Sequence, residues 1–173
     1  MDVFEVMKQR RSIRGYSNEA VSDQQIRRLI EAAVLAPSAG NVQPWKFVVV
    51  KDSATKTKLA EAALGQSFVK TAPLVIVVCA DTEKAKKSYG KRGEKLYSIQ
   101  DTAAATQNIL LTVQDLGLAT CWVGAFNDKE VSKAINAPKN IRPVAVLPIG
   151  YAANPVKVPL KKSVDEVIHY ERF

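Results

Sequence analysis

The first residues that could do chemistry lie near the start of the chain, in the run Arg10-Arg11-Ser12-Ile13-Arg14. Three guanidinium groups and a hydroxyl in so short a run can hold a phosphate monoester through charge-assisted, partly bidentate hydrogen bonds. Such clusters are equally typical of solvated charge, or of partners for carboxylates on a neighbouring helix. The run alone therefore leaves a phosphate site and a plain basic surface open.

A second candidate segment, Ala36-Pro37-Ser38-Ala39-Gly40-Asn41, follows one predicted helix later and is closed by Gln43-Pro44-Trp45. Its small side chains and exposed backbone amides would let a flat heterocycle approach closely. Pro, Ser, Gly and Asn are also ordinary turn residues, so the segment could be a plain connection. The two segments together, in this order, indicate an aromatic cofactor that carries a phosphate.

Several common sites are excluded by what the sequence lacks. It contains neither GxGxxG nor GxxxxGK[ST], so a dinucleotide fingerprint and a P-loop are absent. His169 is the only histidine, so multi-histidine metal sites are excluded, and no GxSxG elbow accompanies it. Cys79 and Cys121 form no CxxC pair, and both are predicted to be buried thiols. We expect no metal.

The composition is typical of a soluble globular protein. The chain has 173 residues, 47% of them hydrophobic, and a net charge of +8. A basic surface can attract nucleic acid, acidic membranes or phosphorylated small molecules, and charge alone does not choose among them. Asp2 follows Met1, so no signal-peptide start is visible, and no apolar run approaches the roughly 20 residues of a spanning helix. We expect a cytoplasmic protein without a membrane partner.

Periodicity predicts alternating helices and strands within one domain, residues 1–173, and leaves a parallel and a mixed sheet open. Ser22 and Gln25 form a capping box, Gly117 ends a long helix, and Thr82 to Lys95 is a polar, lysine-rich segment interrupted by glycines. The predicted strands are Lys46–Val50, Leu74–Ala80 and Val144–Ile149. The predicted helices are a short one after Asp2, one that begins at Ser22 and is stopped by Pro37, Thr55–Leu64, Leu96–Leu116, one capped by Asn127 and a last one opened by Ser163 and Glu166. Val3, Phe4 and Met7 form the apolar face of the first helix.

The order and spacing of these segments resemble the nitroreductase family of flavin enzymes, in its short form and over nearly the whole chain. The residues that carry the resemblance are the arginine run, the small-residue loop with Gln43-Pro44-Trp45, and the segments 72–78, 117–126, 148–151 and 161–167. The resemblance implies an α+β fold of three layers, a mixed central sheet flanked by helices, and an intertwined homodimer. It also implies FMN at the dimer interface, touched by both subunits.

The same resemblance implies a set of cofactor-binding residues. They are Arg10, Arg11, Ser12 and Arg14 at the phosphate and ribityl end, Pro37, Ser38, Ala39 and Asn41 from the opposite subunit, Gln66 and Lys70 at the pyrimidine side, Val123 and Gly124 near the reactive edge, and Lys161 or Lys162 closing the phosphate site. Larger branches of the family often carry glutamate at the position of Val123, and many relatives carry arginine at the tail lysines. Lysine keeps the charge there but loses the bidentate fork.

The activity implied is an NAD(P)H-dependent flavin oxidoreductase that reduces a small-molecule acceptor (a nitroaromatic, quinone or enone) by ping-pong hydride transfer. The chemistry would occur at the flavin N5, so no catalytic side chain is required. Two other classes stay open: a flavin-binding or storage protein without turnover, and a basic nucleic-acid-binding domain. The second is motivated by the net charge and by Gly90-Lys91-Arg92-Gly93, which matches the loop of KH domains but equally suits a flexible surface loop. We prefer the nitroreductase interpretation to both alternatives and expect no nucleic-acid partner. The segment from Lys84 to Lys95 could be a mobile cover over the substrate or a disordered loop.

Overall fold

A computed structural model describes residues 2–154, 156 and 159–173 of the chain. Four strands form one sheet in the order β1-β2-β4-β3. They are β1 (Trp45–Val50), β2 (Leu74–Asp81), β3 (Ala119–Thr120) and β4 (Ile141–Gly150). The helices are α1 (Val3–Gln9), α2 (Asp23–Val34), the short η1 (Ala39–Asn41), α3 (Ser53–Ala62), α4 (Phe68–Thr71), α5 (Thr82–Arg92), η2 (Gly93–Tyr97), α6 (Ser98–Asp115) and α7 (Asp128–Ala134).

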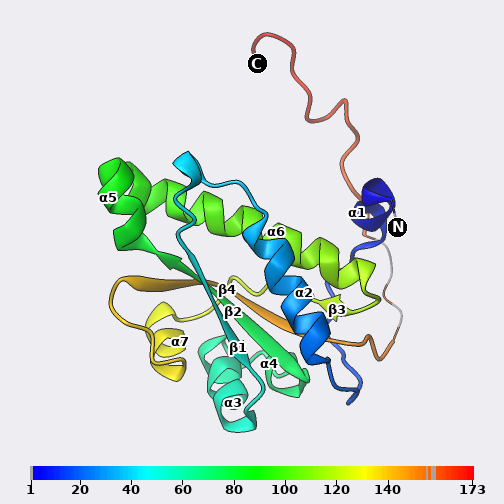
Figure 1. The fold of residues 1–173 in the computed structure, drawn as a ribbon. Helices are drawn as coiled ribbons and strands as arrows, with labels where there is room; N and C mark the ends of the chain where they lie inside the picture. Colours follow the sequence, from blue (N-terminus) through cyan, green and yellow to red (C-terminus); the bar gives the residue numbers. More distant parts are fainter. Residues whose placement is uncertain (1, 155, 157–158) are drawn as a thin grey trace.

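The sheet lies between two layers of helices, as expected, because its central strand is apolar on both faces. Every residue of β2 from Leu74 to Ala80 is fully buried. Successive side chains of a strand point to opposite faces. Leu74, Ile76 and Val78 pack with α2 and α6, whereas Val75, Val77 and Cys79 pack with α3, α4 and α7. Figure 1 shows these two helix layers on either side of the strands.

Strand direction differs in one respect from the expected mixed sheet. All three pairings between the named strands are antiparallel. The parallel component in the described residues is a single bridge between Ser12 and Thr120, beside the edge strand β3. The α+β fold is confirmed, and the sheet within one chain is antiparallel apart from that bridge.

Of the two helices that cover one face of the sheet, α2 begins at its predicted cap and α6 ends just before its predicted glycine. Ser22 and Gln25 cap α2 reciprocally: the Ser22 amide donates to the Gln25 side chain (2.9 Å) and the Gln25 amide to the Ser22 hydroxyl (3.2 Å). Just beyond α6, Gly117 has a φ of +69°, a conformation that glycine adopts without a steric penalty. The long helix of the prediction began too early, since residues 93–97 belong to η2.

The lysine-rich segment from Thr82 to Lys95 is folded, and the expectation of a loop there is wrong. It forms α5 and most of η2, with a sharp turn at Gly90 (φ 56°, ψ −145°) that is essentially restricted to glycine. At Gly93 a Cβ would collide with the Ala85 carbonyl, so glycine allows the two pieces to pack closely. The two glycines therefore build a compact helical turn, and Gly90-Lys91-Arg92-Gly93 is not the open loop of a nucleic-acid-binding module.

Both ends of the chain expose apolar side chains. The predicted apolar face of α1 is in solvent, with Val3 63% and Phe4 62% exposed. At the other end, Ser163 and Glu166 form a hydrogen-bonded turn (2.7 Å from amide to carboxylate) rather than the predicted helix. The tail from residue 159 to 173 extends away from the body of the chain (Figure 1). Its exposed large apolar residues are Leu160, Val164, Val167, Ile168, Tyr170 and Phe173.

Among the helices of the described residues, none combines the length and apolar character that a bilayer crossing requires.

The two cysteines are free and buried, and burial raises the pKa of Cys79 to about 12.

We expect both thiols to react with a thiol reagent far more slowly in the folded protein than in the unfolded one. A pKa of about 12 leaves Cys79 roughly a thousandfold less thiolate at neutral pH than an ordinary cysteine has. A colorimetric thiol titration with and without denaturant measures this difference. Rapid modification of Cys79 in the native protein would contradict the buried position.

Candidate functional site

The arginine run leaves α1 as an extended segment alongside the edge of the sheet. The Ile13 amide donates to the Thr120 carbonyl (2.9 Å), and Ser12 bridges Thr120 in parallel register. Because side chains alternate along extended backbone, Ile13 points into the core while Ser12 and Arg14 are exposed. The strand β3 thus fixes which side chains of the run face outward.

Three residues of the run converge on one point. Burial raises the pKa of the Cys121 thiol, and this shift is opposed by the charges of Arg14 and Arg10 and by a hydrogen bond with Ser12. Arg10, Ser12 and Arg14 therefore lie near the same buried thiol, and we call this part of the molecule the cationic surface around Cys121. This is the donor set that a phosphate monoester requires.

The fourth member, Arg11, has a different role. Its guanidinium donates to the carbonyls of Lys8 and Arg10, the latter at 2.8 Å, and so caps the end of α1. It still lines a cavity of about 530 Å³ beside α1, together with Arg10 and Lys161. Of the two tail lysines, Lys161 lines this cavity beside the arginines, whereas Lys162 is exposed and does not line it.

The residues predicted for the pyrimidine side lie next to the run. The Arg14 guanidinium lies over the ring of Phe68, 5.8 Å from its centroid. Phe68 begins α4, whose last turn carries the exposed Lys70. The Gln66 side-chain amide donates to the carbonyls of Ala63 (2.8 Å) and Ala125 (3.3 Å). Gln66 is therefore held beside the segment that follows Gly124.

Val123 and Gly124 are placed differently from each other. Val123 is 3% exposed, packs in the core with α3, α4 and α7, and exchanges two hydrogen bonds of 3.0 Å with Val146. Gly124 is exposed. The side chain and both backbone groups of Val123 are occupied. Of the two residues, Gly124 is therefore the one available to contact a ligand.

The small-residue loop is a well-defined structure. The Asn41 amide donates to the Ser38 carbonyl (2.9 Å), and Gln43 binds both polar side chains, donating to the Ser38 hydroxyl (2.9 Å) and to the Asn41 side-chain oxygen (3.0 Å). The Ala39 amide donates to the Asp101 carboxylate at 3.1 Å. Pro37 is exposed at the start of the loop.

The loop and the arginine run lie at opposite ends of α6. The loop is tied to Asp101 in the first turn, and the run pairs with Thr120, beyond the last residue, Asp115. At 1.5 Å per residue, the helix between Asp101 and Asp115 alone spans about 20 Å. Figure 1 shows the same separation, with the loop near α5 and the run near α1. Within one protomer the two groups therefore lie at opposite ends of this helix.

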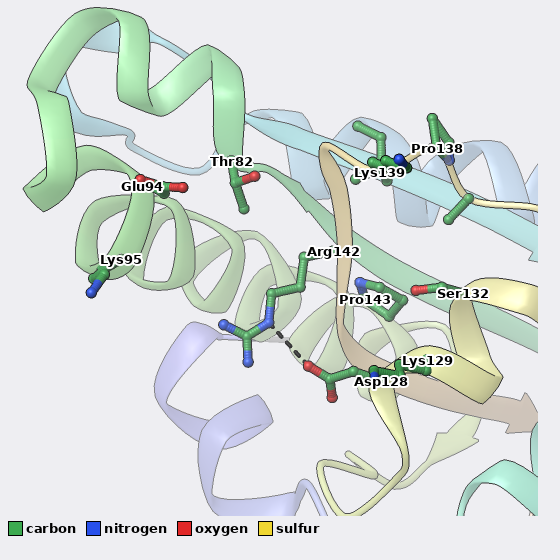
Figure 2. A pocket seen from close by; sticks show the side chains of 12 residues that line it. Thr82, Glu94, Lys95, Asp128, Lys129, Ser132, Pro138, Lys139, Arg142 and Pro143 are labelled. Carbon is green, nitrogen blue, oxygen red and sulfur yellow. Dashed lines mark hydrogen bonds and ion pairs between the residues drawn. The ribbon is translucent and has the colours of Figure 1, made fainter.

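A further cavity, of about 790 Å³, lies between η2, α7 and the start of β4 (Figure 2). Its two carboxylates form ion pairs: Asp128 with Arg142 at 3.1 Å, and Glu94 with Lys86 at 3.3 Å. None of the residues predicted for the cofactor lines it. It lies apart from the cationic surface around Cys121.

Comparison with known proteins agrees with this arrangement. The sequence pattern of the Nitroreductase family matches residues 7–70 and 63–151, which is most of the chain. The chain belongs to the nitroreductase family.

Relatives within the nitroreductase family are similar over most of their length. A protein of Archaeoglobus fulgidus with a provisional NADH dehydrogenase/NAD(P)H nitroreductase name is 41% identical, over 82% of this chain and 80% of its own. An FMN reductase [NAD(P)H] of Bacillus subtilis is 30% identical, over 99% and 74%. The structure of an FMN-dependent nitroreductase from Clostridium difficile superposes with a TM-score of 0.85 at 28% identity, over 98% and 99%.

Asp101 is the site residue that sequence reasoning missed in this nitroreductase. It is 7% exposed, yet it is an acid within the broadly apolar helix α6. A carboxylate at such a position costs free energy unless it is hydrogen-bonded. An acid in an apolar stretch of the sequence therefore indicates a buried polar contact. Only the fold shows that its partner is the amide of Ala39.

Proposed function

We propose that this nitroreductase-family protein is an FMN-dependent NAD(P)H oxidoreductase that reduces electron-poor small molecules such as nitroaromatics, quinones or enones. The observation that carries the proposal is the convergence of Arg10, Ser12 and Arg14 around Cys121, with Lys161 lining the adjoining cavity. These donors fit the phosphate of FMN in number and charge. The names of relatives as an FMN reductase and an FMN-dependent nitroreductase support the same cofactor.

When bound, FMN supplies the redox chemistry, because its N5 accepts and returns a hydride. The protein supplies position and charge. Arg10, Arg14 and Lys161 would hold the phosphate, and Gln66 would meet the pyrimidine edge. The ammonium group of Lys70 would stabilise negative charge at that edge. We propose that the nicotinamide and the acceptor occupy one exposed face in turn, which gives ping-pong kinetics.

The activity is tested on the purified protein. We expect a yellow preparation whose visible flavin absorbance is bleached by NADH or NADPH under anaerobic conditions and restored by a quinone or nitroarene. Steady-state turnover over a panel of acceptors with both nicotinamides then defines the substrates. A yellow protein that neither nicotinamide bleaches would be a flavin carrier. A colourless protein that takes up no FMN would contradict the proposal as a whole.

We also propose that the functional form is a homodimer in which each site takes residues from both chains. The separation of the loop from the arginine run along α6 supports this, since the loop of one copy and the arginine run of another can meet between the two. The exposed apolar residues of α1 and of the tail supply surface that a second copy would cover.

Light scattering after size exclusion should therefore give twice the chain mass of 18.9 kDa. Charged substitutions in the tail, Val164→Asp with Ile168→Asp, should shift the protein toward the monomer, because both side chains would lose an apolar partner. As a control, Leu35→Asp changes a residue that is 80% exposed at the end of α2 and should leave the mass unchanged. A monomeric mass for the unaltered protein, measured at micromolar concentration or above, would contradict the assembly.

A further inference from the structure

The loop from Pro37 to Asn41 ends in left-handed backbone, which recurs at Gln43 just beyond it. Gly40 and Asn41 have φ values of 52° and 55°, and Gln43 follows with 52°. Gly40 and Asn41 are residue types that adopt this left-handed region readily, whereas the side chain of Gln43 disfavours it. Such a conformation persists where neighbouring elements hold it.

The neighbour that holds the centre of the loop is Asp101. Its Oδ1 accepts the Ala39 amide proton at 3.1 Å, and the residue is 7% exposed. None of the ion pairs between described residues includes Asp101. Burial raises the pKa of this carboxyl, an effect that the Ala39 hydrogen bond opposes. The desolvated carboxylate is therefore directed at the loop and at no cation.

Helix α5 holds the loop from a second side. The hydroxyl of Tyr89 lies so close to Gly40 that no Cβ would fit there. The Lys84 ammonium donates to the Gln43 carbonyl at 3.3 Å. The loop is therefore enclosed by α5 and α6, and Asp101 is the member of this enclosure that fixes a backbone amide.

We propose that Asp101 is a positioning residue for the flavin: by accepting the Ala39 amide proton it holds Pro37–Asn41 in the conformation that meets the cofactor. The inference rests on the proposed function, because the loop has this role only in a protein that binds FMN. Asp101 acts through the loop and has no contact with the reacting atoms. Its removal should therefore alter cofactor affinity more than the fold.

The decisive comparison is between Asp101→Ala, which removes the acceptor, and Asp101→Asn, which keeps an oxygen at the same place. Loss of a hydrogen bond to a charged group can lower the population of the binding-competent loop about tenfold, and the FMN dissociation constant of Asp101→Ala should then rise by up to about tenfold. Asp101→Asn should stay within about threefold of the unaltered protein, since its amide oxygen accepts the same proton. Quenching of flavin fluorescence on titration of the apoprotein measures each value.

Thr106→Val is the matched control on the same helix. Thr106 is fully buried, and its hydroxyl bonds only within α6, to the Thr102 carbonyl at 2.7 Å. This variant should lose some stability and keep its FMN affinity. Urea unfolding of each apoprotein separates a general loss of stability from a specific loss of cofactor.

Amide hydrogen exchange in the apoprotein gives a readout that is independent of flavin. Peptides covering residues 37–43 should exchange faster in Asp101→Ala than in Asp101→Asn or the unaltered protein. Failure of the proposed function would show as no FMN uptake by the unaltered protein. Failure of the inference alone would show as normal uptake with equal affinity in Asp101→Ala, or as unchanged exchange of the loop.

Discussion

Replacing Arg10 and Arg14 together with alanine is expected to raise the dissociation constant of FMN by at least about 100-fold, so that the purified protein is colourless. Each charge-assisted hydrogen bond contributes about 1.5–3 kcal/mol, and 1.4 kcal/mol corresponds to a tenfold change in binding. Both guanidinium groups act on the surface around Cys121, and a phosphate there would lose its two strongest donors. Each single variant should show a smaller effect in the same direction.

The ratio of flavin to protein absorbance after purification and a fluorescence titration of the apoprotein measure this loss. Arg27→Ala is the matched control, because Arg27 is an exposed arginine on α2 whose partner is Glu31, at 3.4 Å. It removes one positive charge, as each single variant does, without touching the site. Retention of FMN at the unaltered occupancy by the Arg10/Arg14 double variant would refute the phosphate site.

Ile76→Ala should destabilise the protein by about 2–5 kcal/mol, the range for deleting a buried aliphatic side chain in a well-packed core. Ile76 is fully buried at the middle of β2, where Val49 flanks it on β1 and Leu147 on β4. Domains of this kind are stable by about 5–15 kcal/mol, so the loss would be a large fraction of the total. Urea unfolding monitored by circular dichroism measures it.

Val49→Ala provides the comparison on the neighbouring strand. Val49 pairs directly with Ile76 but is 41% exposed, so its truncation removes much less buried surface. We expect a loss below about 1 kcal/mol. Equal losses for the two variants would mean that β2 is not the centre of the sheet.

The elements that sequence reasoning located correctly are those whose signals are local. The capping box of Ser22 and Gln25, the glycine after α6 and the uninterrupted apolar run of β2 each depend on residues near one another in the chain. Segment 82–95 was misassigned because its lysines and glycines are typical of loops. The deciding contact, Gly93 against the Ala85 carbonyl, is a packing effect that composition does not reveal.

The candidate site was predictable in its residue types and not in its geometry. The arginine run stands out by charge alone, and the structure groups Arg10, Ser12 and Arg14 as expected. Arg11 caps α1 through local contacts that its residue type does not reveal, whereas the burial of Val123 depends on its long-range pairing with Val146 on β4. The strand direction was equally undecided, because a buried strand has the same pattern in parallel and antiparallel sheets.

The span of α6 has a genetic consequence under the proposed assembly. A chain defective in the arginine run and a chain whose loop from Pro37 to Asn41 no longer binds the cofactor would each ruin both sites of its own homodimer. In a mixed dimer, however, one site receives both lesions and the other receives none. Random pairing of the two chains would then restore about a quarter of all sites, so two individually inactive alleles would complement each other.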